Sequence, residues 1–243
     1  MKKLICLPVI LLFFCSCETL MQAGGTVFNK GVTQQEADLG IREALTQGIG
    51  KGITFLNTTN GFFGNEAYKL LLPAEAVKIE NTLRSIGLGS QVDKAILQIN
   101  RSAEDAIGYA KPIFTDAIRQ MTLTDALNII KGSKNSATSY FRNKTESALI
   151  ATFTPIIKSS LDKLNATRYY SDIINTYNKL PTTRSKVNPD LVNYVAERAT
   201  VALFDQVEKE EINIRENPVA RTTQILKKVF GSQFEMNRPG HGL

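Results

Sequence analysis

Residues 33 to 56 carry two sequence patterns at once, and together they restrict the fold more than any other stretch of this chain. Apolar side chains recur at intervals of three and four residues, the spacing of a helix with one buried face. Small residues occupy every fourth position, at Gly40, Ala44, Gly48 and Gly52. Each interior glycine costs a helix up to about 1 kcal/mol relative to alanine. The small-residue ridge therefore predicts that another helix packs closely against this one.

Capping boxes mark where some of the helices begin. Thr33 is followed three residues later by Glu36, and Thr122 by Asp125, and each pair can satisfy the free N–H groups of a first helical turn. Similar apolar stripes continue through the chain, and no segment shows the alternation typical of strands. Most connections are short, which favours antiparallel neighbours in a bundle. The sequence thus predicts an all-α, single-domain bundle of about nine helices.

Two prolines fall inside predicted helices. Pro112 lies within the stripe from Val92 to Met121, and Pro155 lies within the stripe from Thr145 to Leu164. Proline lacks the N–H group that an interior helical position donates. We therefore expect a kink or a break at Pro112 and an interruption of the helix at Pro155.

The first residues have the composition of an export signal. Two lysines precede an apolar run, residues 4 to 14, which is too short to span a bilayer. Small residues must come before the cleavage site, and Cys15 and Ser16 stand before Cys17. Cleavage is therefore predicted before Cys17, and it divides the chain as follows: signal peptide 1–16, lipidated N-terminus and tether 17–32, helical domain 33–231 and flexible tail 232–243.

The stretch from Phe14 to Cys17 resembles the lipobox of bacterial lipoproteins, in which this cysteine receives lipid on its sulfur and amine. Phe14 and Cys15 depart from the residues that are usual at their positions, and an ordinary secretory signal is the alternative. Several acyl chains on Cys17 would anchor the chain stably in a membrane. Glu18 and Thr19 follow, not Asp, and the resemblance then implies the outer membrane, with the domain facing the periplasm.

Composition excludes several functional classes. The net charge of +6 becomes +4 once Lys2 and Lys3 are removed, and both signs are interspersed, so no nucleic-acid partner is expected. The single histidine, His241, lies in the tail, and the cysteines stand at positions 6, 15 and 17. No metal site or cofactor is predicted, because the ligands of zinc and related metals are missing. Without a nucleophile–histidine pair or a phosphate-binding loop, the chain is not expected to be an enzyme.

The best candidate for binding is at the start of the last helix. Arg221, Thr222 and Thr223 precede a first turn whose N–H groups and dipole favour an anion. The guanidinium adds a planar fork of donors that suits carboxylate or phosphate. The alternative is structural: Arg221 pairs with an acidic residue such as Glu216, and the threonines bond locally.

Two further groups of residues allow more than one interpretation. Tyr177 belongs to a tyrosine cluster that would line an interface, or would instead contribute core rings with wet hydroxyls. Glu208, Glu210 and Glu211 stand together on a predicted helix, where such a run is typical of a solvated face.

Several segments of the chain resemble successive landmarks of the bacterial domain-of-unknown-function 4197 family: GFFGNEAYKLLLP, LRSIGLGSQVD, AIRQMTLTDALNIIKG, VNPDLVNYVAERA and ENPVARTTQILKKVFG. The resemblance implies a small all-helical exported protein, often a lipoprotein, and it implies no activity. We therefore expect a lipid-anchored envelope protein that binds or scaffolds an envelope partner. A periplasmic carrier of a lipid or small ligand is the first alternative and an enzyme the second, and the oligomeric state stays open.

Overall fold

The computed structural model describes residues 31–73, 76–163, 165–179, 186 and 190–236. These residues form helices and no strand, which confirms the all-α prediction. The predicted signal peptide, Cys17, nearly all of the tether and the end of the tail lie outside the described residues.

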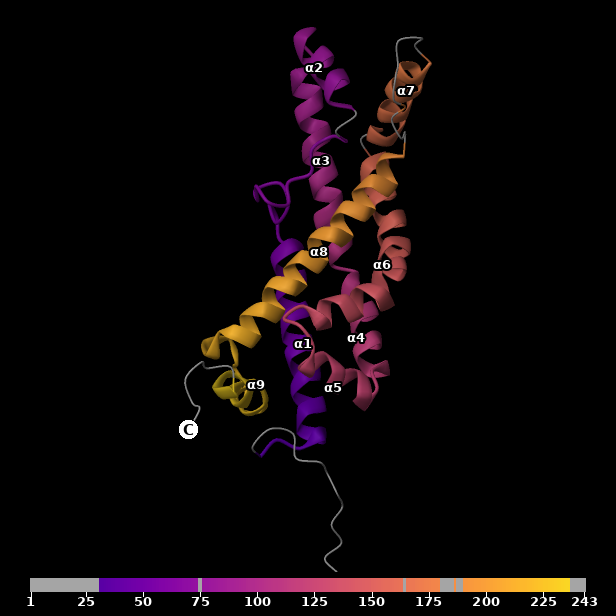
Figure 1. The fold of residues 1–243 in the computed structure, drawn as a ribbon. Coiled ribbons are helices and arrows are strands. Elements are labelled where there is room, and N and C mark those ends of the chain that lie inside the picture. Colours follow the sequence, from indigo (N-terminus) through magenta and orange to yellow (C-terminus); the bar gives the residue numbers. More distant parts are fainter. Residues whose placement is uncertain (1–30, 74–75, 164, 180–185, 187–189, 237–243) are drawn as a thin grey trace, which may run out of the picture.

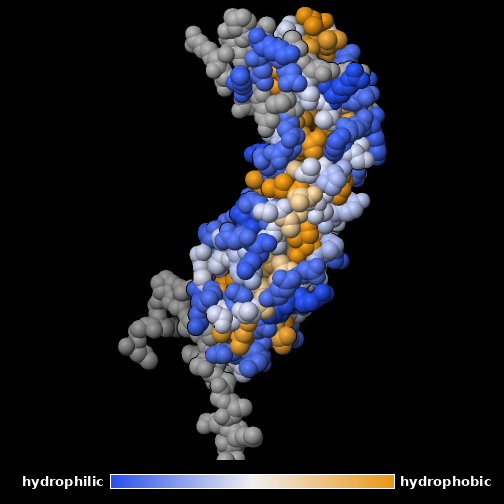
Figure 2. Space-filling model, turned by 90° about the vertical axis from the view of Figure 1, so that its right-hand side faces the viewer, coloured by the Kyte–Doolittle hydropathy of each residue, from blue (hydrophilic) through white to orange (hydrophobic). Residues whose placement is uncertain are grey.

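Helices follow one another along the whole described chain (Figure 1). Their bounds are α1 Gln34–Leu56, α2 Val77–Ser85, α3 Gly89–Ile107, α4 Ala110–Gln120, α5 Leu123–Lys131, α6 Ser136–Asp162, α7 Ala166–Asn178, α8 Leu191–Glu216, the 3-10 helix η2 Pro218–Ala220, and α9 Gln224–Met236. The long helix α8 crosses the molecule diagonally and packs against α6, α1 and α3, whereas α4, α5 and α9 lie along α1. In the second view the body is elongated and curved (Figure 2).

One apolar core runs through these contacts. At its centre the ring centroid of Phe114 in α4 lies 6.0 Å from that of Phe141 in α6 and 5.9 Å from that of Phe204 in α8. All three rings are almost completely buried. Tilted and edge-on ring pairs of this kind add to the stability that burial alone provides. The core therefore joins helices that are far apart in the sequence.

The small-residue ridge of α1 packs as predicted. A Cβ atom at Gly40 would lie 2.6 Å from Cγ2 of Val229 in α9. A Cβ at Gly48 or Gly52 would lie 3.3 Å from the Cβ of a residue in α8, Glu210 or Gln206 respectively. The small residues of the ridge thus allow two different helices to pack closely on α1, α9 at Gly40 and α8 at Gly48 and Gly52.

Neither proline interrupts a helix at the position that the sequence predicted. Pro155 lies inside α6, which continues from Ser136 to Asp162. The break expected at Pro112 falls earlier, at Gly108 and Tyr109 between α3 and α4. Pro112 is then the third residue of α4, where the N–H group that proline lacks would have had no partner within the helix.

One part of the molecule has few buried side chains. We call residues 76–96, which comprise α2 and the first part of α3, the α2–α3 arm. Helix α2 buries no residue and packs on α3. The buried side chains Val92 and Ile96 of α3 lie outside the main core. The arm stands at the end of the molecule opposite the start of α1 (Figure 1).

Among the described residues no helix is both long enough and apolar enough to cross a membrane.

The close approach at Gly40 predicts opposite effects for two glycine-to-alanine changes in α1. Gly40→Ala should lower the free energy of unfolding by about 1–3 kcal/mol, because the new methyl group overlaps the rigid side chain of Val229. Gly50→Ala should raise it by up to about 1 kcal/mol, because no atom lies within 4 Å of the added Cβ. Urea unfolding of both variants measures the difference.

A rescue variant separates this clash from a general loss of helix quality. Adding Val229→Ala to Gly40→Ala should restore part of the lost stability. If both glycine variants stabilise the protein equally, α9 does not pack on α1 as described.

The second capping box predicts a dependence of stability on pH. Hydrogen bonds from the N–H group and hydroxyl of Thr122 lower the pKa of Asp125. The ionised carboxylate therefore stabilises the fold above the unfolded pKa of about 4, and this contribution is lost as the pH falls through the folded pKa. Asp125→Ala should cost about 1 kcal/mol at pH 7, as cap deletions do, and much less near pH 2. Thermal unfolding at both pH values tests this, and an equal cost at both would refute it.

Candidate functional site

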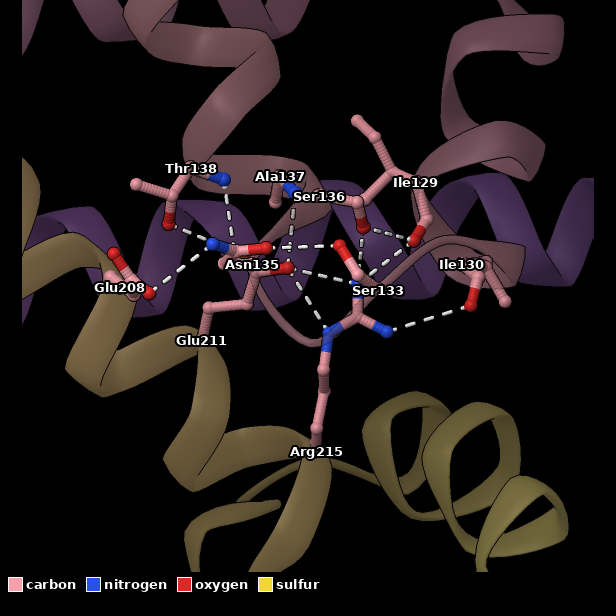
Figure 3. A network of polar contacts seen from close by, with 10 residues as sticks. All are labelled: Ile129, Ile130, Ser133, Asn135, Ser136, Ala137, Thr138, Glu208, Glu211 and Arg215. Atoms are coloured by element: carbon pink, nitrogen blue, oxygen red, sulfur yellow. Dashed lines mark hydrogen bonds and ion pairs between the residues drawn. The ribbon is translucent and has the colours of Figure 1, made fainter. Parts of the chain in front are cut away.

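The carboxylate of Glu211 accepts hydrogen bonds both from the start of α6 and from Arg215. Helix α8 carries it to the start of α6, where its two oxygens accept hydrogen bonds from the N–H groups of Ala137 at 3.0 Å and Thr138 at 2.9 Å (Figure 3). The hydroxyl of Thr138 adds a third, at 2.8 Å. These N–H groups belong to the first turn of α6 and have no partner inside that helix. Glu211 thus caps a distant helix, since Ala137 precedes it by 74 residues in the sequence.

Arg215, one turn further along α8, caps the neighbouring helix end. Its Nη2 donates to the carbonyl of Ile129 at 2.8 Å and to the hydroxyl of Ser136 at 3.0 Å. Its Nε and Nη2 also donate to Glu211, at 3.1 and 2.9 Å. Both side chains are about nine-tenths buried. A single ion pair therefore holds the C-terminus of α5 and the N-terminus of α6 together (Figure 3).

The expectation of a solvated face is wrong for Glu211. This residue is only 9% exposed, because it continues the buried stripe of Phe204 and Val207 at helical spacing. Glu208 and Glu210 lie partly exposed and make single contacts, with Asn135 at 3.3 Å and Lys51 at 3.4 Å respectively.

Arg221 lies inside the joint between α8 and α9. It is 4% exposed, and its Nε and Nη2 donate to the carbonyls of Ile214 at 3.0 Å and Arg215 at 2.8 Å. Burial lowers the pKa of the Arg221 guanidinium, which nevertheless stays charged at neutral pH. These bonds cap the C-terminus of α8 and connect Arg221 to the Glu211–Arg215 pair through the Arg215 carbonyl. They go to carbonyls rather than to Glu216, the partner that the structural alternative suggested.

Of the two neighbouring threonines, Thr223 bonds locally, as the structural alternative stated, whereas Thr222 bonds to a residue of α1. Thr222 donates its hydroxyl to the side chain of Gln47 at 2.6 Å, and Gln47 donates to the carbonyl of Ala220 at 3.0 Å. The hydroxyl of Thr223 accepts from the N–H of Leu226 at 3.3 Å, in the first turn of α9. Arg221 and its neighbours therefore tie α8, α9 and α1 together.

The remaining predicted site residues lie elsewhere. Tyr177 belongs to α7, which Figure 1 places at the opposite end of the molecule from α9. The structure thus does not bring Tyr177 next to Arg221, and the Tyr177 side chain lies outside the described residues. Cys17 also lies outside them.

A small cavity lies beside the ion pair, between α1, α6, α8 and α9. Its volume is about 20 Å³, which is room for a single water molecule and far less than a drug-sized ligand fills. The lining is mostly apolar and comprises Ile41, Ala44, Leu45, Gly48, Ile49, Ala137, Val207, Glu211, Ile214, Arg215 and Phe230.

A second polar cluster forms around Tyr68, on the other side of α8. The Tyr68 hydroxyl receives hydrogen bonds from Gln206 at 2.5 Å and Lys209 at 2.7 Å, and it donates to Asp205. Burial raises the pKa of Tyr68, and the hydrogen bond to Asp205 raises the pKa of Lys209. The first shift favours the protonated phenol and the second favours the charged amine.

Two other polar residues that sequence reasoning missed, one buried and one partly buried, also hold backbone groups. Glu104, 4% exposed, accepts from the N–H groups of Phe62 at 3.0 Å and Phe63 at 3.1 Å. Arg42 donates to carbonyls at the C-terminus of α4, including that of Met121 at 2.7 Å. In the sequence, the pattern that could have identified these residues is a charged residue that stands next to or inside a helical apolar stripe. In the described residues no group of three or more His, Cys, Asp or Glu side chains could hold a metal ion.

These features define a class of protein: an all-helical domain whose buried charges join the ends of its own helices. Residues 31–231 match the family model described as "Protein of unknown function (DUF4197)", and the chain belongs to this family. No curated protein and no solved structure matches the chain.

The ion pair at the α5–α6 joint predicts a large stability loss on truncation. Glu211→Ala should lower the free energy of unfolding by about 3–5 kcal/mol, because it leaves Arg215 and two N–H groups without their partner in a buried site. Chemical unfolding followed by circular dichroism measures this cost.

Glu210→Ala is the matched control, one residue away on the same helix. Its ion pair with Lys51 is partly exposed, so its loss should cost less than about 1 kcal/mol. Similar costs for the two variants would show that Glu211 does not hold the joint.

Proposed function

We propose that this chain is a lipid-anchored protein of the bacterial cell envelope that acts as a binding or scaffolding module. The observation that carries the proposal is the separation between two ends of the molecule. Helix α1 starts at one end, where the predicted tether from Cys17 joins the bundle, and the α2–α3 arm stands at the other (Figure 1). An anchor at Cys17 would leave the arm free to face away from the membrane.

The arm end exposes large apolar side chains. Leu71, Val77, Ile86 and Leu88 are 55%, 44%, 65% and 37% exposed, and apolar surface is visible at the upper end of the molecule in Figure 2. Apolar side chains gathered in one place mark interaction surfaces more often than scattered ones do. They support a role in binding another macromolecule.

The alternatives receive less support. A lipid carrier needs a cavity many times larger than the 20 Å³ beside the ion pair. An enzyme needs ionisable groups that converge with perturbed pKa values in a cleft. The buried charges described above instead face backbone groups at helix ends.

The length of the predicted tether would set how far the body reaches from the membrane. Residues 17–32 comprise 16 residues, and an extended chain of this length spans at most roughly 50 Å. The body would then be able to reach partners on the membrane surface or beyond it.

Matched cysteine changes test the anchor. Cys17→Ser should remove the acyl mass from the N-terminal peptide and shift the protein out of the membrane fraction, because the lipid is attached to this thiol. Cys15→Ser should leave the acyl mass and the membrane location unchanged. Mass spectrometry and membrane fractionation measure both.

Two results would contradict the proposed function. A mature chain that still begins at Met1, or that carries no acyl mass at Cys17, would remove the anchor. Lipid that co-purifies with the Cys17→Ser protein in native mass spectrometry would favour the carrier alternative.

A further inference from the structure

The charges of this chain are divided unevenly between two neighbouring segments, although both signs occur along the whole sequence. Residues 131–186, which include α6 and α7, hold ten Lys and Arg side chains against three Asp and Glu. Residues 187–216, which include α8, hold three Lys and Arg against seven Asp and Glu. Helix α8 packs on α6. The fold therefore places a basic segment beside an acidic one, and the small net charge of the chain conceals this asymmetry.

The outer side of α6 presents lysines to solvent. Phe141, Leu149 and Ile157 bury the opposite side of this helix in the core, whereas Lys144 and Lys158 are exposed. These two lysines are 14 residues apart in the sequence, which is close to four helical turns, so they lie on the same side of α6. Between them, this side carries small exposed residues without charge: Ser147, Ala148, Ala151 and Pro155.

The basic surface continues beyond α6. Lys163 follows the end of α6, Arg168 lies in α7 and Lys179 follows α7, and all three are exposed. Helices α6 and α7 pack on each other and lie on one side of the molecule (Figure 1), the side that Figure 2 turns toward the viewer. We call Lys144, Lys158, Lys163, Arg168 and Lys179 the α6–α7 basic face.

The described acidic side chains on or beside α6 already have partners within the protein. Glu146 pairs with Arg142 at 3.3 Å, and Asp162 pairs with Lys158. Asp125, which accepts a hydrogen bond from a tyrosine of α6, caps the first turn of α5. The α6–α7 basic face therefore keeps a net positive charge that an anionic partner would meet.

The spacing of these charges suits an extended anionic surface rather than a single small anion. A helix rises about 1.5 Å per residue, so Lys144 and Lys158 stand roughly 21 Å apart along α6. The headgroups of an anionic membrane present negative charge over such distances. Each lysine close to an anionic lipid surface raises the affinity about fivefold. A basic patch combined with a lipid anchor also holds a protein on a membrane more firmly than one acyl chain does.

We propose that the α6–α7 basic face binds the anionic headgroups of the membrane that carries the anchor. The proposal rests on the proposed function, because the anchor brings the body within reach of that surface. The predicted tether of 16 residues, which spans at most roughly 50 Å, allows the body to lie on its side. Helices α2 and α3 stand across the molecule from α7 (Figure 1), so the arm stays accessible from the opposite side.

Energy transfer in vesicles tests this orientation in the intact, lipidated protein. The helical body contains no native cysteine, so Ser147→Cys carries a single dye on the outer side of α6. Thr54→Cys carries the dye on an exposed position of α1 and serves as the matched control. With acceptor dyes on the headgroups of phosphatidylcholine–phosphatidylglycerol vesicles, transfer should be stronger from Ser147→Cys than from Thr54→Cys. The difference should be lost in pure phosphatidylcholine vesicles and in about 1 M salt, where the Debye length is about 3 Å.

Matched charge changes test whether these side chains cause the orientation. Lys144→Gln, Lys163→Gln and Lys179→Gln together should lower the population bound through this face about 100-fold, because three fivefold contributions multiply. Arginine at the same three positions keeps the charge and should keep the orientation, which separates a charge effect from misfolding. The control variant removes the same charge from three exposed lysines on other elements: Lys78→Gln, Lys94→Gln and Lys227→Gln. An equal loss in both glutamine variants would overturn the proposal, because net charge alone would then explain the orientation.

Vesicles without anionic lipid separate this proposal from the anchor. If the chain stays on phosphatidylcholine vesicles, but phosphatidylglycerol never favours transfer from Ser147→Cys over Thr54→Cys, the role of the basic face is refuted and the anchor stands. If the chain leaves phosphatidylcholine vesicles and binds those with phosphatidylglycerol, the anchor fails and the basic face stands. A face that binds a DNA duplex and does not respond to phosphatidylglycerol would also overturn the membrane as its partner.

Discussion

The ion pair between Glu211 and Arg215 is the interaction on which the rest of the bundle depends. It is about nine-tenths buried and completes two helix ends from the side of a third helix. A buried charge is costly unless its hydrogen bonds are satisfied, and free backbone groups at helix ends are costly for the same reason. In this protein the buried charges and the free backbone groups satisfy each other by hydrogen bonding, so neither cost remains. Helices α5, α6 and α8 are thereby held in one arrangement.

The same solution recurs at other joints. Arg42 caps α4 from α1, Arg221 caps α8 from the following turn, and Glu104 holds the loop after α1. Charges that look like candidate ligand sites in the sequence are thus used to connect the protein to itself. Among the described residues, large apolar side chains are exposed at the arm end, as at Val77 and Ile86, and also elsewhere, as at Leu39 and Val219.

A bundle with buried, capped joints is consistent with the proposed binding or scaffolding role, because such a module needs a defined shape. The core and the capped joints connect α1, α5, α6 and α8, whereas the arm contributes few buried side chains.

The sequence by itself determined the all-α class, the capping boxes at Thr33 and Thr122, the close-packed ridge of α1 and the family, because these depend on local spacing and residue type. Tertiary structure alone decided that Glu211 is buried and that Arg221 faces carbonyls. It also placed the break near Pro112 at Gly108. The partners of these residues come from other helices or from turns whose course the local pattern does not specify, and a buried charge is recognised only from the groups that fold around it.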